Sequence, residues 1–160
     1  MSKLLVVVWK KCSKQARTYH FATSALNLAV TLGDMARFAE ARQILREAIP
    51  KARKLKGDDH DLTLCLRYNY VYSLVNDDTS SLSDLREAVA MIEDVERRAR
   101  RVYGANHPEA VSKTVTLRKA RQKLVNAERT DAIANVEQQQ FSNNLTESHL
   151  KDLEGTTTAA

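Results

Sequence analysis

The sequence predicts an all-α fold of stacked helical hairpins, and three observations support this prediction. Helix breakers are scarce, because the 160 residues include only four Gly and two Pro. Apolar residues recur at three- and four-residue steps, the period of an amphipathic helix. The chain also repeats itself, since Asn27–Leu32 is echoed by Asn69–Leu74 and Gly57–His60 by Gly104–His107. An echo at this spacing indicates stacked copies of one hairpin.

The spacing of the echo locates an insertion. Asn27 and Asn69 are 42 residues apart, whereas His60 and His107 are 47 residues apart. Five extra residues therefore lie in the second copy, where the polar run 76–81 occurs. We expect this run to form a solvated turn that leaves the packing undisturbed.

The first two helices are expected at about 15–32 and from Arg37 to the glycine at position 57. Gly33 breaks the apolar stripe of the first helix, and Gly57 is a typical C-terminal cap of the second. Pro50 falls within the second stripe, where it should kink the helix or remove one backbone hydrogen bond.

The third and fourth helices each follow a candidate N-cap. Either Asp58 or Asp59 can cap the third helix, and either Ser81 or Ser83 can cap the fourth, which spans about 82–103.

The fifth helix opens at Pro108, a favoured first-turn residue, and has no obvious stop before about position 140. A long and mostly polar helix at the end of a stack is typical of a capping helix. The expected organisation is a partial helix at 1–14, a repeat domain at 15–140 and a flexible tail at 141–160.

The cysteine positions and the hydropathy of the chain indicate its cellular compartment. Cys12 and Cys65 lie in no CxxC motif, which favours reduced thiols in a cytoplasmic protein. The apolar run 4–9 is far shorter than the roughly 20 residues that span a bilayer. We therefore expect a cytoplasmic protein without a membrane partner.

The sequence offers no support for catalysis, so we expect no enzyme activity, no cofactor and no metal. Motifs for a zinc protease, a serine hydrolase or a phosphate-binding loop are missing from the sequence. The histidines are isolated, and the two in equivalent turns are expected to cap or brace those turns: His20, His60, His107 and His149.

Two groups of residues resemble the tetratricopeptide repeat, in the long variety found in kinesin light chains. The first copy shows Asn27-Leu28-Ala29, Phe38-x-Glu40-Ala41, Ala48 and Gly57-x-x-His60. The second copy shows Asn69, Leu74, Glu87-Ala88 and Gly104-x-x-His107-Pro108. The resemblance covers 18–116, and Ala36 stands where the family has a turn glycine. It implies a right-handed α-solenoid of about two repeats plus a long C-terminal capping helix.

The resemblance also implies a function and a site. Such stacks are protein-interaction modules, and the first helix of each hairpin lines a concave groove in which asparagines hold an extended peptide. The implied groove residues are Asn27, Val30, Asp34, Asn69, Tyr72, Asn76, Lys119 and Lys123. In the alternative interpretation, Asn27 and Asn69 only tie neighbouring helices together. A carboxylate clamp is poorly matched, since its cationic places hold Thr23, Ser112 and Thr116.

Charge distribution suggests the partner and leaves two alternatives open. Residues 1–20 hold five cations and no carboxylate, and residues 97–129 hold ten cations against two carboxylates. These flanks favour an acidic peptide partner. Nucleic-acid binding through the basic face at 97–123 is one alternative, but it lacks stacking aromatics beyond Tyr103. The other is a structural or self-associating helical fragment, because about three repeats are needed for stability.

Overall fold

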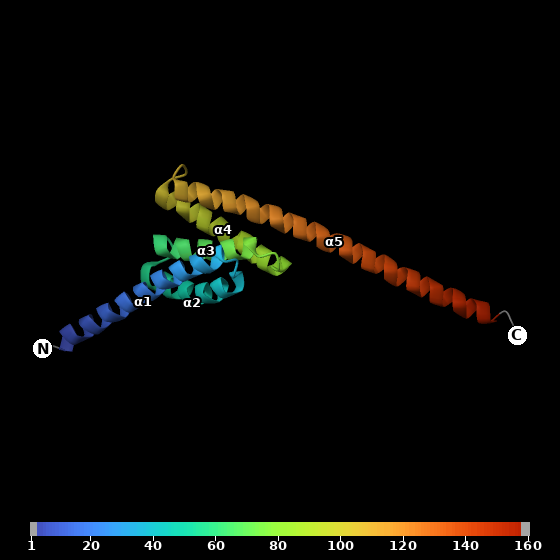
Figure 1. Ribbon diagram of the computed structural model, residues 1–160, viewed down its shortest axis with the longest axis horizontal. Helices are drawn as coiled ribbons and strands as arrows, with labels where there is room; N and C mark the ends of the chain where they lie inside the picture. Colours follow the sequence, from blue (N-terminus) through green and yellow to red (C-terminus); the bar gives the residue numbers. More distant parts are fainter. Residues whose placement is uncertain (1–2, 158–160) are drawn as a thin grey trace. The chain divides into compact units, whose positions relative to one another are not determined.

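The computed structural model describes residues 3–157, and side chains within residues 13–143. Within residues 3–157, five helices follow one another in chain order (Figure 1). They are α1 (Lys3–Asp34), α2 (Phe38–Lys56), α3 (Asp61–Asn76), α4 (Leu82–Tyr103) and α5 (Pro108–Thr157). No strand occurs in the described range. The predicted all-α class is therefore confirmed.

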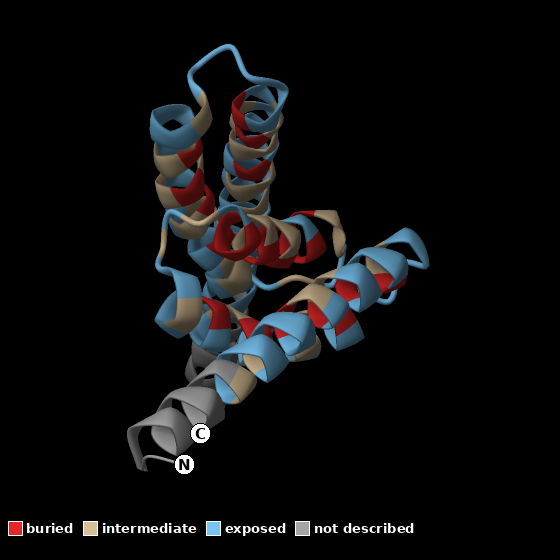
Figure 2. Cartoon of the chain, turned by 90° about the vertical axis from the view of Figure 1, so that its left-hand side faces the viewer, coloured by how far each residue is buried: buried red, intermediate tan, exposed pale blue. Residues whose placement is uncertain are grey.

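The chain divides into two units, residues 1–124 and residues 125–160. The first unit holds α1–α4 and the beginning of α5. In it, α1 packs on α2, α2 on α3, α3 on α4, and α1 also on α3. Buried residues follow the sides of these helices that face one another (Figure 2). In its described part, the second unit is the remainder of α5, through Thr157.

The helices at the two ends of the chain are longer than expected. Helix α1 begins at Lys3, well before position 15. Helix α5 continues beyond 140 to Thr157, because neither Gly nor Pro interrupts the chain between Glu109 and Gly155. Helix α2 runs through Pro50 to Lys56. The proposed division at 1–14, 15–140 and 141–160 stays a prediction.

The sequence echo returns in the core. The buried positions of α2 are Ala41, Leu45, Ala48 and Ala52. Adding 47 to each number gives buried positions of α4, namely Ala88, Ile92, Val95 and Ala99. All eight side chains are at most 1% exposed. Burial of one apolar stripe on α2 and on α4, and of more than half of the circumference of α3, holds the unit together.

The turns between the hairpins also repeat. Gly57 and Gly104 end α2 and α4 with φ of 88° and 91°, and their N–H groups donate to carbonyls of those helices. After each glycine comes a histidine whose Nδ1 accepts a backbone N–H: His60 from Leu62 at 3.1 Å and His107 from Glu109 at 3.2 Å. The expectation that these two histidines cap the turns is confirmed.

The N-cap predicted for α3 is wrong, whereas that of α4 is confirmed. Helix α3 begins at Asp61, so that His60 is its N-cap, whereas Asp58 binds Arg53 and Asp59 binds Arg98. Ser81 caps α4 in a complete capping box with Asp84.

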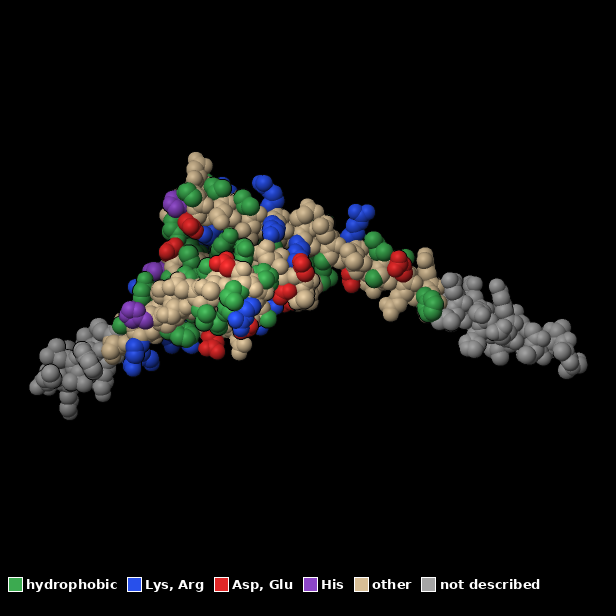
Figure 3. Space-filling model, in the orientation of Figure 1, with side chains coloured by type: hydrophobic (Ala, Val, Ile, Leu, Met, Phe, Trp, Pro, Cys, Tyr) green, Lys and Arg blue, Asp and Glu red, His purple; other side chains and the backbone are tan. Residues whose placement is uncertain are grey.

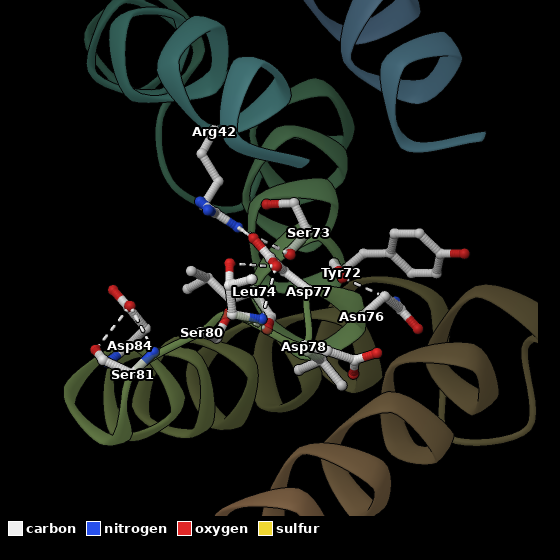
Figure 4. A network of polar contacts seen from close by, with 12 residues as sticks. Arg42, Tyr72, Ser73, Leu74, Asn76, Asp77, Asp78, Ser80, Ser81 and Asp84 are labelled. Carbon is white, nitrogen blue, oxygen red and sulfur yellow. Dashed lines mark hydrogen bonds and ion pairs between the residues drawn. The ribbon is translucent and has the colours of Figure 1, made fainter. Parts of the chain in front are cut away.

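The inserted turn at 77–81 is more closely tied to the stack than expected (Figure 4). Asp77 forms an ion pair with Arg42 of α2 at 2.7 Å, and both side chains are largely buried. Thr79 donates its N–H and its hydroxyl to Asp77, and the Ser80 hydroxyl donates to the Leu74 carbonyl at 2.7 Å. The hydrogen bonds from Thr79, together with Arg42, lower the pKa of Asp77 to about 2 against the cost of burial.

Ala36 adopts φ of 57°, the left-handed conformation, at the place where the family has glycine. This conformation costs a residue with a Cβ about 1–2 kcal/mol. Ala36→Gly should therefore raise the free energy of unfolding by about 0.5–1 kcal/mol, once the entropy of glycine in the unfolded chain is subtracted. Urea unfolding followed by circular dichroism measures the change.

The matched control is Ala90→Gly, at an exposed position inside α4. There glycine should destabilise by about 1 kcal/mol, because the backbone is helical. If Ala36→Gly destabilised the protein as Ala90→Gly does, the assigned strain would be wrong.

Asp77 should make stability depend on pH below about 4. A carboxylate whose folded pKa is about 2, against an ordinary 3.8, stabilises the fold above pH 3.8 and loses this contribution as pH falls through 2. Asp77→Asn should thus cost about 1–2 kcal/mol at neutral pH and progressively less between pH ~4 and pH ~2. Urea unfolding across this range measures the gap.

Asp78→Asn serves as the control, because the Asp78 side chain is fully exposed. It should change stability by less than about 0.5 kcal/mol. A gap between wild type and Asp77→Asn that stayed constant down to pH ~2 would contradict the account.

Candidate interaction groove

A surface hollow of about 200 Å³ lies between α1 and α3. Helix α1 lines it with Ala29, Val30, Gly33 and Asp34, and α3 lines it with Tyr68, Asn69, Tyr72 and Ser73. Four of the eight predicted groove residues are therefore brought together here: Val30, Asp34, Asn69 and Tyr72.

The hollow has a tightly packed floor and open rims. Ala29 and Ser73 are 3% and 1% exposed, whereas Val30 and Tyr72 are 42% and 39% exposed. At Gly33 the missing side chain leaves space, since a Cβ there would lie 3.9 Å from the Tyr72 ring. The hollow thus offers an aromatic face and an aliphatic face to a ligand.

Asn69 is the polar group of this hollow. Its amide Nδ2 donates to the carbonyl of Cys65, one turn earlier, at 2.9 Å. This hydrogen bond lies within α3 and does not connect α3 to a neighbouring helix. An asparagine amide has two N–H donors and an oxygen acceptor. A donor and an acceptor therefore remain for a peptide group.

Asn27 lies apart from the hollow. Its side chain is exposed, and it is not among the residues that line the space. Its backbone carbonyl accepts the Thr31 hydroxyl at 3.0 Å. The role predicted for Asn27 stays a prediction.

The other predicted residues meet at the C-terminal end of α3. Lys119 of α5 donates to Asn76 Oδ1 at 2.6 Å, and Asn76 Nδ2 donates to the Tyr72 carbonyl at 2.8 Å. Lys123 donates to the carbonyls of Val75 and Asp77 at 3.0 and 2.9 Å. Lys123 thereby satisfies the negative end of α3 and is engaged in the fold. Lys119 is exposed and bridges α5 to α3.

Tyr68 is a lining residue that sequence analysis assigned only to an apolar stripe. Its hydroxyl lies 3.3 Å from the Ser112 hydroxyl and 3.2 Å from that of Thr116, both on α5. Lys113 Nζ lies 4.7 Å from the centre of its ring. Ser112 and Thr116 occupy two cationic places of a carboxylate clamp, and here both meet Tyr68. The sequence does hold a signal that Tyr68 lies on the same side of α3 as Tyr72, because the two residues are one helical turn apart. Their ring centroids are 6.5 Å apart.

The basic residues of α4 are largely engaged with carboxylates. Arg98 pairs with Asp94 at 2.8 Å and with Asp59 at 2.7 Å, and Arg101 also pairs with Asp59. Asp94 additionally pairs with Arg67 at 2.8 Å. Burial raises the pKa of the Asp94 carboxyl. The hydrogen bonds that it accepts from Arg98, Arg67 and Arg97 outweigh this effect and hold the pKa well below its usual range. These pairs offset much of the positive charge on which the nucleic-acid alternative depends.

The described residues also bear on metal binding and on membrane insertion. They contain no group of three or more His, Cys, Asp or Glu side chains placed to hold a metal ion. None of their helices combines the length and the apolar character that a membrane span requires.

Comparison with known proteins identifies the repeat. The family model of the tetratricopeptide repeat, of the kinesin light chain type, matches residues 21–61 and residues 73–109. Neither the curated proteins nor the solved structures contain a match to this chain. Repeats of this family generally mediate protein–protein interaction, and the family is one of non-enzymatic scaffolds. With two matched segments and the helical hairpins that they form, the chain belongs to the tetratricopeptide repeat proteins.

Proposed function

We propose that the chain is a protein-interaction module that binds an extended peptide segment of a partner protein in the hollow between α1 and α3. One observation supports this most strongly. Asn69 offers unused donor and acceptor capacity beside the exposed sides of Val30 and Tyr72. A peptide backbone needs paired donors and acceptors, and its side chains need apolar surface.

The proposed peptide is acidic at the end that meets α5. Lys119 is exposed and donates a hydrogen bond to Asn76, and an ammonium group has three N–H donors. A carboxylate beside Lys119 would gain a charge-assisted hydrogen bond. At the other rim, Asp34 is exposed and can accept an N–H of the same peptide.

Selection from a displayed library of random peptides tests the proposal. Selected peptides should carry Asp or Glu, and their affinity should fall about tenfold for Asn69→Ala, a loss of about 1.4 kcal/mol. Val30→Glu should abolish binding, because it places a charge on the apolar rim. Lys119→Ala should weaken binding mainly at low salt.

Val102→Glu is the matched control, because Val102 is as exposed as Val30 but lies at the end of α4. It should leave peptide affinity unchanged. The proposal fails if the library yields no binder, or if Asn69→Ala and Val30→Glu bind as wild type does while circular dichroism shows an intact fold.

A further inference from the structure

An apolar groove lies on the first hairpin, away from the residues of the proposed peptide site. It has a volume of about 320 Å³ and is lined chiefly by Phe21, Ala25 and Leu28 of α1 and by Ile44 of α2. Phe21 and Leu28 are 39% and 50% exposed. Figure 3 shows hydrophobic side chains at the surface of this part of the protein among charged ones. Exposed apolar grooves of this kind mark contact sites.

The second repeat indicates what such a groove accepts. The residues 42 positions after Ser24 and Leu28 are Leu66 and Tyr70 of α3, which are 0% and 2% exposed. Tyr70 is covered from α2, where Arg46 lies 5.7 Å from its ring and donates to its hydroxyl at 3.2 Å. On α3 this face thus receives a helix. The corresponding face of α1 is therefore shaped for a helix as well.

The second unit contains a helix with an exposed apolar side. Its part of α5 exposes Val125, Ile133 and Val136, which are 58%, 52% and 54% exposed. At about 100° per residue these three side chains fall within about a quarter turn of the helix. Helices in proteins are stabilised mainly by packing an apolar face. This segment has such a face, exposed along its length.

Charge complements the two surfaces. Residues 1–20 hold five cations and no carboxylate, whereas residues 125–143 hold three carboxylates and one cation. Lys14 and Arg17 are exposed on α1, one to two turns before Phe21. Glu137 is exposed directly after Val136 and flanks the apolar side of α5, whereas Asp131 is exposed on the opposite side of the helix. Opposite charges at such a contact favour encounter and fix its direction.

We propose that the chain self-associates, with the 125–143 segment of α5 of one copy docked in the groove between α1 and α2 of a second copy. The apolar stripe of α5 covers Phe21, Leu28 and Ile44, and Glu137 at the edge of this stripe faces Lys14 and Arg17 of α1. The two contact surfaces are different, so the contact is heterologous. It leaves the α1–α3 hollow free and stands independently of the proposed peptide binding.

Sedimentation equilibrium of the full chain measures the association. Leu28→Glu on the groove and Ile133→Glu on the helix should each weaken self-association at least tenfold, and added salt should weaken it in the wild type. Val115→Glu is the control, because Val115 is 57% exposed on α5 but belongs to neither surface. It should associate as the wild type does.

A mixing experiment isolates the heterologous contact. Copies with Leu28→Glu keep the helix, and copies with Ile133→Glu keep the groove. Their equimolar mixture should therefore associate although neither variant does so alone. A wild type that stays monomeric at about 100 μM overturns the proposal. So does an Ile133→Glu variant that associates as wild type, or a mixture that stays monomeric while circular dichroism shows folded variants.

Discussion

The close approach of helices at buried alanines is the constraint on which this structure depends. Ala41, Ala48 and Ala52 on α2 and Ala88 and Ala99 on α4 are at most 1% exposed. Helix axes come within about 8 Å only where the side chains between them are small. Because the same positions recur after 47 residues, α4 meets α3 with the stripe that α2 uses in the first hairpin. The repeat in the sequence is therefore a repeat of contacts.

The candidate groove follows from this packing. Since α1 packs on α3 as well as on α2, the residues of α1 and α3 that face away from the core come side by side. Ala29 at the floor keeps the two helices close, while Val30 and Tyr72 stay at the rims. The turns serve the same arrangement, because a left-handed glycine followed by a capping histidine redirects the chain identically after α2 and after α4. The candidate groove and the core are thus formed by different sides of the same helices.

The sequence predicted the helices better than the contacts between them. Periodicity and breakers located α4 within a residue, and the resemblance placed Val30, Asp34, Asn69 and Tyr72 on one surface. The cap of α3 was mispredicted because the helix begins only at Asp61, while Asp58 binds Arg53 of α2 and Asp59 binds two arginines of α4. The partners of Asp59 are 39 and 42 residues away, and no local pattern reveals them. The Arg42–Asp77 pair and the contacts of Tyr68 with α5 were not predicted either, because they also join residues far apart in the sequence. Long-range polar contacts require the fold before they can be assigned.

Equilibrium unfolding of Ala88→Leu beside Ala90→Leu tests the central claim most directly. Ala88 is 0% exposed at the helix contact, whereas Ala90 is exposed on the same helix. If close approach at alanine governs the stack, Ala88→Leu should lower the free energy of unfolding by about 1–3 kcal/mol through overpacking. Ala90→Leu should change it by less than about 0.5 kcal/mol. Equal stabilities of the two variants would contradict the account.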